Sequence, residues 1–289
     1  MREKQYKNID RMKDVVNMNR GYLFLCFGKY YVDEASNLVK TLRKFGDEYP
    51  VSILCNLEDV DYANSTELFD KVILFDFDNE FSKMDKTPFE KYGGTPKILM
   101  MEYSPYDETI YTDTDMLVQS NTKNVWDTMS MINQPYVVTG LPADCNDPLI
   151  ISLSKKLNKN ITDMNFIHSG IIYYNRNHKD FNLFLETLKY FWKNYDEYNL
   201  SIRGFRGGKA DEHAIFAAIT KLDYEVINPA KVAIITWNYH SDIELPSNIV
   251  TGGPMHSILS ELDTPIPFIH MFKNYRQHYD ILYNRLINM

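Results

Sequence analysis

Three Asp-x-Asp triplets, at residues 59–61, 76–78 and 113–115, are the groups of side chains in this sequence best suited to bind a divalent cation. Their carboxylate oxygens are hard ligands of the kind that Mg²⁺ and Mn²⁺ prefer. A bare triplet is usually a solvated turn, so the neighbouring residues must decide which one binds a metal. The first triplet lies in a polar stretch typical of a loop, and a charged, polar segment follows the second.

The third triplet differs because apolar runs at 109–112 and 116–118 flank it on both sides. In an extended backbone, residues i and i+2 project to one side, so Asp113 and Asp115 can face one cation while Thr114 faces away. Carboxylates between apolar segments are costly to bury unpaired, and a metal ion removes that cost. The third triplet is therefore the predicted metal site.

The apolar pattern around these triplets alternates between strands and helices. Strands are predicted at 21–27, 51–55, 71–75, 109–112, 116–118, 136–139 and 169–174, and helices at 32–45, 95–103, 181–192, 211–219 and 275–287. The strand–helix–strand order at the start predicts an α/β fold with a parallel sheet between helices. The sequence contains no repeat, low-complexity stretch or long linker, so we expect one α/β domain with a C-terminal amphipathic helix.

The composition excludes several classes of function. The 289 residues carry a formal net charge of −8, so the basic surface that nucleic acids require is not expected. Three cysteines are too few for a disulfide framework, and no CxxC pair indicates a zinc ribbon. The polar first twenty residues lack a signal-peptide core, and no run is long enough to span a membrane. We expect a cytoplasmic, soluble protein, and peripheral membrane association stays open.

Four segments, taken in order, resemble glycosyltransferase family 8, which includes glycogenin and bacterial lipopolysaccharide galactosyltransferases. Residues 97–118 resemble that family's core, in which a helix bearing Lys or Arg precedes an apolar strand ending in Asp-x-Asp. Residues 166–175 are similar to its Asn-Ser-Gly strand, with His168 in place of Asn. The resemblance spans roughly residues 20–275.

The remaining two segments depart from the family pattern at single positions. Residues 210–213 resemble the family's Asp-Gln helix start, with Glu212 in place of Gln. Residues 268–273 resemble its late His motif, although the family usually has a Gly and a longer gap before its Lys.

The resemblance implies the GT-A fold, a Rossmann-like single domain with a mixed central sheet and a C-terminal helix. The domain would cover residues 21–273, after an N-terminal extension at 1–20 and before an amphipathic helix at 274–289 that packs on the domain. The implied donor is a nucleotide-sugar, with UDP-sugars favoured, bound at the carboxyl ends of the first strands. Phe27 and Tyr30 would flank the base, and Tyr30 either stacks on a pyrimidine or is a surface tyrosine.

The resemblance also implies roles for residues around the predicted metal site. Asp113, Asp115 and His270 would hold Mn²⁺ or Mg²⁺, and the imidazole favours Mn²⁺. The phosphates would be neutralised by Lys97 and Lys273. The other implied donor-binding residues are Asp113, His168, Ser169 and Gly170.

Two acidic residues are the implied catalytic pair. Asp211 would bind hydroxyl groups of the donor sugar, and Glu212 would face the anomeric carbon in a transfer with retention. An acidic helix start that stabilises the helix dipole is the competing explanation, and in that case Asp211 would cap the helix predicted from residue 211. The acceptor, whether a glycan, a protein or a lipid, is not implied.

Two other functions remain open. Haloacid-dehalogenase-like phosphatases use Asp-x-Asp after a strand with the first Asp as nucleophile, but that motif normally lies near the chain start and is followed by Thr or Val. Here Asp113 lies deep in the chain and Leu117 occupies that place. A catalytically inactive nucleotide-sugar-binding protein is compatible with the departures at His168 and Glu212.

Overall fold

The computed structural model describes residues 20–76, 95–201, 210–229, 232–236, 267–271 and 276–288. In chain order these residues form β1 (Arg20–Cys26), α1 (Lys29–Lys44), β2 (Val51–Cys55), α2 (Leu57–Ser65), β3 (Lys71–Leu74), α4 (Thr95–Leu99), β4 (Glu108–Thr112), β5 (Met116–Val118), α5 (Lys123–Ser130), β6 (Tyr136–Pro142), α6 (Pro148–Leu157), β7 (Asn165–Asn175), α7 (Phe181–Lys193), α8 (Asp211–Leu222), β8 (Ala233–Thr236), β9 (Phe268–Met271) and α10 (Arg276–Asn288). Short 3-10 turns lie at Met100–Glu102 and Ile161–Asp163.

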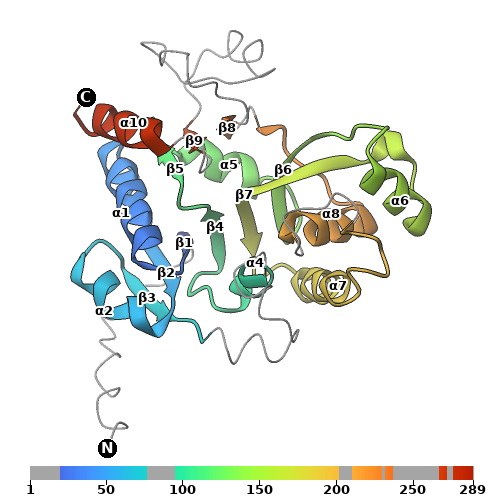
Figure 1. Ribbon diagram of the computed structural model, residues 1–289, viewed down its shortest axis with the longest axis horizontal. Coiled ribbons are helices and arrows are strands. Elements are labelled where there is room, and N and C mark those ends of the chain that lie inside the picture. The colour runs from blue at the N-terminus through green and yellow to red at the C-terminus, as the bar shows by residue number, and fades with distance from the viewer. Residues whose placement is uncertain are drawn as a thin grey trace, which may run out of the picture.

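Six strands form the central sheet in the order β3-β2-β1-β4-β7-β6 (Figure 1). The first four strands in this order are parallel to one another, whereas β7 runs antiparallel to both β4 and β6. Strand β2 lies between helices on both faces and is buried along its whole length, which explains its mainly apolar sequence. Its one polar side chain, Ser52, forms a hydrogen bond with the hydroxyl of Tyr106 at 2.6 Å. The predicted α/β fold with a mixed central sheet is confirmed.

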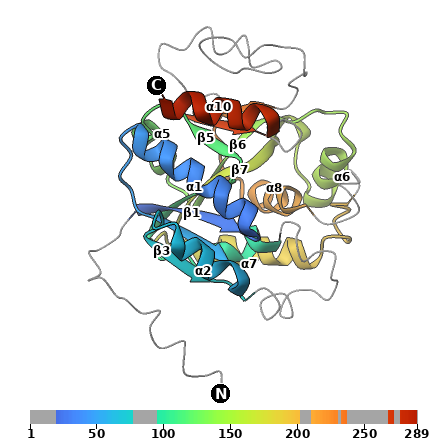
Figure 2. The ribbon, with the colours of Figure 1, turned by 60° about the vertical axis from the view of Figure 1, so that its left-hand side comes forward.

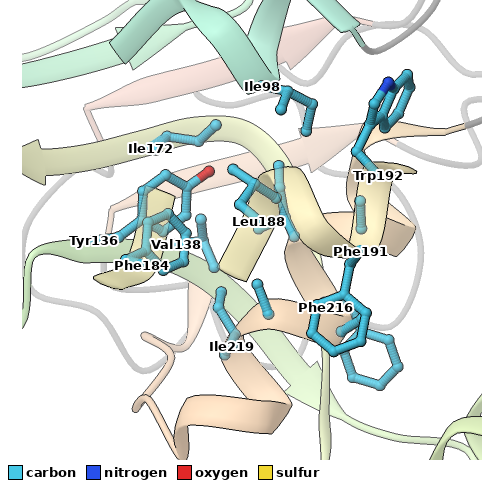
Figure 3. Close-up of a cluster of buried hydrophobic side chains, with 14 of the residues drawn as sticks. Ile98, Tyr136, Val138, Ile172, Phe184, Leu188, Phe191, Trp192, Phe216 and Ile219 are labelled. Atoms are coloured by element: carbon cyan, nitrogen blue, oxygen red, sulfur yellow. The ribbon is translucent and has the colours of Figure 1, made fainter. Parts of the chain in front are cut away.

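The two faces of this sheet pack into two separate apolar cores. Successive side chains of a strand point to opposite faces, so Leu23 joins one core while Tyr22 and Phe24 join the other. The first core is completed by α4, α6, α7 and α8, and Figure 3 shows part of it, with Tyr136 stacked on Phe184 at 4.2 Å between ring centroids. The second core is completed by α1, α2 and α5.

A second, three-stranded sheet has the order β5-β9-β8. Strand β5 pairs antiparallel with β9, so that Met116 lies opposite His270. Helix α10 packs beside α1 and over this small sheet (Figure 2). Its contacts form a third apolar cluster that consists of Leu117, Ile269, Tyr279, Leu282 and Leu286. The small sheet thus contains Met116, which follows Asp115, and the candidate ligand His270, and α10 packs over it.

Most predicted elements lie within a few residues of those in the structure, and the differences have physical causes. Helices α2, α5 and α6 and strands β8 and β9 were not predicted. Residues 59–61, expected in a loop, lie within α2, whose buried side chains are only Asp59, Val60 and Ala63, too few to give a clear apolar period. Helix α6 has a clear start signal, because Asp147 caps it and Pro148 begins it.

Residues 1–19 lie outside the described residues, whereas most of the C-terminal segment is described as α10. Arg20, assigned to the N-terminal extension by the sequence analysis, is the first residue of β1 and pairs with Glu108 at 3.1 Å. The division into an extension at 1–20, a domain at 21–273 and a C-terminal segment at 274–289 stays a prediction. None of the helices in the described parts of the chain has the length and apolar content that crossing a bilayer requires.

Candidate functional site

Asp113, Asp115 and His270 converge at the junction between the two sheets. Each of the three offers a ligand atom, and these atoms lie within 4.8 Å of one another. His270 Nε2 is 3.0 Å from Asp115 Oδ1 and 3.8 Å from Asp113 Oδ2. Two carboxylates and one imidazole are a donor set that fits a divalent first-row cation such as Mn²⁺.

The two aspartates reach this arrangement by a turn and not by the extended backbone that we expected. Strand β4 ends at Thr112, β5 begins at Met116, and the chain turns at 114–115. We call residues 113–115 the aspartate turn. Thr114 does face away from the carboxylates, because its hydroxyl donates a hydrogen bond to Glu34 of α1 at 3.0 Å. The turn is needed because the chain leaves the central sheet here and enters the small sheet beside β9.

Lys97, from the short helix α4, lies between the aspartate turn and the start of α8. Its Nζ is 2.8 Å from Asp113 Oδ1 and 3.5 Å from Asp211 Oδ2. Burial would lower the pKa of Lys97, but Asp113 and Asp211 more than offset this and hold it above its usual value. Burial likewise opposes ionisation of Asp113, yet the charges of Lys97 and His270 lower its pKa to about 2. The site therefore holds a lysine cation against an aspartate anion.

Asp211 and Glu212 begin α8 and point toward β7. Asp211 was expected to cap this helix, but the cap position belongs to Ala210 and no side chain caps it. The Asp211 carboxylate instead accepts a hydrogen bond from Ser169 Oγ at 2.8 Å, and Glu212 Oε1 accepts one from Ser169 N at 3.2 Å. Burial and the charge of Asp211 raise the pKa of Glu212 to about 7. Glu212 can therefore bind or release a proton near neutral pH.

His168 and Gly170 bring β7 against the metal ligands. Gly170 N donates to His168 Nδ1 at 3.2 Å, which leaves the His168 ring proton on Nε2. The rings of His168 and His270 lie 5.0 Å apart, and burial followed by the charge of His270 lowers the pKa of His168 well below its usual value. Burial also opposes protonation of His270, but Asp115 raises its pKa above the usual value. His168 is thus neutral, and its neighbour His270 lies against the carboxylates of Asp113 and Asp115.

The backbone of Gly170 lies too close to both rings for any side chain. A Cβ atom there would meet His168 Cε1 at 2.5 Å and two atoms of the His270 ring at 2.9 Å. The carbonyl oxygen of Gly170 also accepts a hydrogen bond from Asp113 N at 2.9 Å. This glycine therefore lets three parts of the site pack together.

The three other predicted donor-binding residues are less closely connected to this centre. Phe27 is half-buried after β1, with its ring 6.2 Å from that of Phe75. Tyr30 is 38% exposed, and its hydroxyl donates a hydrogen bond to Glu34. Lys273 lies outside the described residues. Tyr30 is thus linked to the aspartate turn through one shared carboxylate.

Two residues at the site were not predicted. Tyr111 donates a hydrogen bond to Asp113 Oδ1 at 2.5 Å. Glu34 joins Thr114 to Tyr30, as described above. A signal for Glu34 exists in the sequence, since it lies four residues before Leu38 on the apolar face of α1, where a carboxylate needs a partner.

This protein resembles known proteins in its fold and not in its amino-acid sequence. No family model matches this sequence, and no curated protein sequence matches it. The structure, by contrast, matches solved structures along most of its length. Against mouse xyloside xylosyltransferase 1 the TM-score is 0.57 at 12% identity, over 88% of this chain and 98% of that one. The chain has a glycosyltransferase fold.

Two further solved structures of sugar transferases agree with this result. For the galactosyltransferase LgtC, solved with donor and acceptor sugar analogues, the TM-score is 0.55 at 13% identity, over 93% of this chain and 95% of that one. For the bifunctional glycosyltransferase WbbM the TM-score is 0.60 at 14% identity, over 96% of this chain and 50% of that one. The chain thus spans about half of WbbM. The predicted GT-A class is confirmed as a fold.

Proposed function

We propose that this protein is a metal-dependent glycosyltransferase that moves a sugar from a nucleotide-sugar donor to an acceptor. The observation that carries this proposal is the meeting of Asp113, Asp115 and His270 at the end of β4, within a fold shared with solved glycosyltransferases. In open α/β sheets, ligands bind outside the carboxyl ends of the parallel strands, and β4 ends at this position. The proposed donor is a UDP-sugar, and the proposed outcome is retention.

Asp113, Asp115 and His270 would hold Mn²⁺ or Mg²⁺, and Mn²⁺ is favoured because one of the three ligands is an imidazole. When bound, the ion supplies Lewis-acid stabilisation of the charge on a departing diphosphate. Lys97 lies beside Asp113 with its charged form strongly favoured, so it is placed to neutralise a phosphate oxygen. The sequence suggests a phosphate-binding role for Lys273, and this role stays a prediction.

Asp211, Glu212 and Ser169 form the proposed sugar-facing side of the site. Ser169 holds both carboxylates through its hydroxyl and its backbone N–H. Asp211 would accept hydrogen bonds from sugar hydroxyls, and its orientation is fixed by Ser169 and Lys97. Glu212 would face the anomeric carbon, where an ionised carboxylate stabilises positive charge. His168 and Gly170 would border this side of the site, since both lie against the ring of His270.

Phe27 and Tyr30 are proposed to lie on the base side of the donor. Both follow β1, whose carboxyl end borders the region where a nucleotide binds in such sheets. Tyr30 presents an exposed ring that can stack on a base. The acceptor stays open among glycans, proteins and lipids, and the cytoplasmic location expected from the sequence stays a prediction.

A donor screen tests this proposal. Purified protein is incubated with UDP-, GDP-, CMP- and dTDP-sugars in Mn²⁺, Mg²⁺ or EDTA, and the released nucleotide is quantified. We expect metal-dependent release from one donor, lost in EDTA and in Asp115→Asn. The matched control is Asp61→Asn, the same change in another Asp-x-Asp triplet, on the exposed part of α2.

Two results would contradict the proposal in different ways. Binding of a nucleotide-sugar without release, with a panel of candidate acceptors present, would favour an inactive binding protein. Hydrolysis of phosphate esters that Asp113→Asn abolishes, together with failure to bind any nucleotide-sugar by calorimetry, would favour the phosphatase alternative. Equal loss of activity in Asp61→Asn and Asp115→Asn would show that the aspartate turn has no special role.

A further inference from the structure

Glu34 is a carboxylate in an unusual place, the buried face of α1. It is 5% exposed, and it is the only charged residue among the buried residues of that helix. Burying an ionised carboxylate is costly unless hydrogen bonds and charges compensate for the lost water. The position of Glu34 therefore has to be explained by the groups that it contacts.

Those groups come from three separate segments of the chain. Glu34 Oε2 accepts a hydrogen bond from Thr114 Oγ1 at 3.0 Å, and Oε1 accepts one from the hydroxyl of Tyr30. The backbone carbonyl of Glu34 accepts one from the hydroxyl of Tyr279 in α10 at 3.4 Å. One residue of α1 thus connects the aspartate turn, the start of α1 and the C-terminal helix.

Thr114 lies between the two candidate metal ligands and projects to the side opposite their carboxylates. Its side chain is 7% exposed, and its bond to Glu34 ties the middle of the aspartate turn to α1. The turn is also held at one end, where Asp113 N donates to Gly170 O. A turn fixed at its middle and at one end presents Asp113 and Asp115 in a constant relative orientation.

We propose that Glu34 is a positioning residue that holds the aspartate turn in its metal-binding geometry and couples it to Tyr30 and α10. This inference rests on the proposed function, because it assigns Glu34 a role in the same metal site. Glu34 itself contacts neither metal nor donor in this proposal and acts through Thr114. Glu34 should therefore contribute to the metal affinity of the protein. If Glu34 were needed only for packing, it would contribute to the free energy of unfolding and not to metal affinity.

The test measures Mn²⁺ binding and thermal unfolding together. Free Mn²⁺ is counted by electron paramagnetic resonance, with and without UDP, for wild type, Thr114→Val, Thr114→Ser and Ser36→Ala. Thr114→Val keeps the shape of the side chain but loses the donor, and Thr114→Ser restores it. Ser36→Ala is the matched control, since Ser36 is a buried hydroxyl of α1 that bonds only within the helix, to Val32 O at 2.7 Å, among the contacts described.

We expect Thr114→Val to bind Mn²⁺ about 3- to 10-fold more weakly, which corresponds to part of one hydrogen bond to a charged acceptor. Thr114→Ser should recover wild-type affinity, and Ser36→Ala should lower only the unfolding temperature. Glu34→Gln should weaken Mn²⁺ binding in the wild type but should add little to Thr114→Val, because both changes break the same link.

Three outcomes would overturn the inference. Mn²⁺ affinity of Thr114→Val within about twofold of wild type, with donor turnover intact, would remove the role of Glu34 while leaving the proposed function standing. Fully additive effects of Glu34→Gln and Thr114→Val would show that the two residues act separately. Failure of the wild type to bind Mn²⁺ at all, with or without UDP, would overturn this inference together with the metal-dependent function.

Discussion

Substitution of Gly170 by alanine is the sharpest single test of the site geometry. The added Cβ would lie 2.5 Å from His168 Cε1 and 2.9 Å from Cε1 and Nδ1 of His270. Carbon atoms in contact are normally about 3.5–4.0 Å apart, so one or both rings must move by roughly an ångström. Both rings are buried, which leaves them little room to do so.

The expected cost follows from this forced movement. Overpacking a well-filled interior typically costs about 1–3 kcal/mol, which for a chain of this size lowers the unfolding temperature by roughly 3–8 °C. Displacement of His270 would also lengthen its 3.0 Å contact with Asp115. Changes that misplace a metal ligand typically weaken metal binding by about 10- to 100-fold. Gly170→Ala should therefore lose both stability and Mn²⁺ affinity.

Gly140 offers a matched control for this prediction. A Cβ at Gly140 in β6 would lie 2.9 Å from the backbone oxygen of Phe166, away from the metal ligands. Gly140→Ala should therefore lose comparable stability and keep its Mn²⁺ affinity. Both variants are measured by calorimetric unfolding in EDTA and by Mn²⁺ titration. Wild-type Mn²⁺ affinity in Gly170→Ala, or an equal loss in Gly140→Ala, would refute the argument that Gly170 sets the geometry of the ligands.

Three further predictions address charge and capping. The pKa of Glu212 is raised to about 7 in the folded protein. The protonated form of Glu212 therefore favours folding fully at pH values below its ordinary pKa, and this contribution to the free energy of unfolding is lost as the pH rises through 7. Glu212→Gln should thus be more stable than wild type at pH 8, by about 1–3 kcal/mol, and the difference should vanish near pH 4; a pH-independent difference would contradict this. Lys97→Met removes the ammonium 2.8 Å from Asp113 and should lower the free energy of unfolding in EDTA by about 2 kcal/mol. Adding Mn²⁺ should then raise the unfolding temperature of the variant more than that of wild type, and an equal rise would argue against Lys97 as a counter-charge of the metal site. Asp147→Ala removes the cap of α6 and should cost about 1 kcal/mol in thermal unfolding without changing Mn²⁺ binding, and a change in binding would connect α6 to the site.

Most strands of the central sheet were predictable because their residues are buried and therefore mainly apolar. Strand β2 lies between two layers of helices, so every one of its residues is buried and all but Ser52 are apolar. The strand–helix alternation then identifies a parallel sheet. Strands β8 and β9 were not predicted, although their four-residue sequences are mostly apolar, because no strand–helix alternation marks them and their pairing joins segments far apart in the chain.

Asp113 and Asp115 were recognisable, since an acidic pair between apolar runs needs a compensating charge or metal, and the other candidate residues came from the family resemblance. The geometry of these residues was not predictable. Asp113 and Asp115 were expected to converge through extended backbone, but a turn between two sheets brings them together. Asp211 was expected to cap α8, yet its carboxylate accepts from Ser169. Local rules describe a residue's neighbours in sequence, and these contacts are with other elements.

The sequence by itself determined the α/β class, the order of the main elements and the set of side chains with metal-binding chemistry, because periodicity and residue type act locally. The tertiary structure decided how those side chains meet and which residues support them. His270 reaches Asp115 across 155 positions because β9 pairs with β5, and Thr114 reaches Glu34 because α1 packs against that strand. Such contacts depend on how whole elements pack, and the free energy of that packing is spread over many residues far apart in the chain.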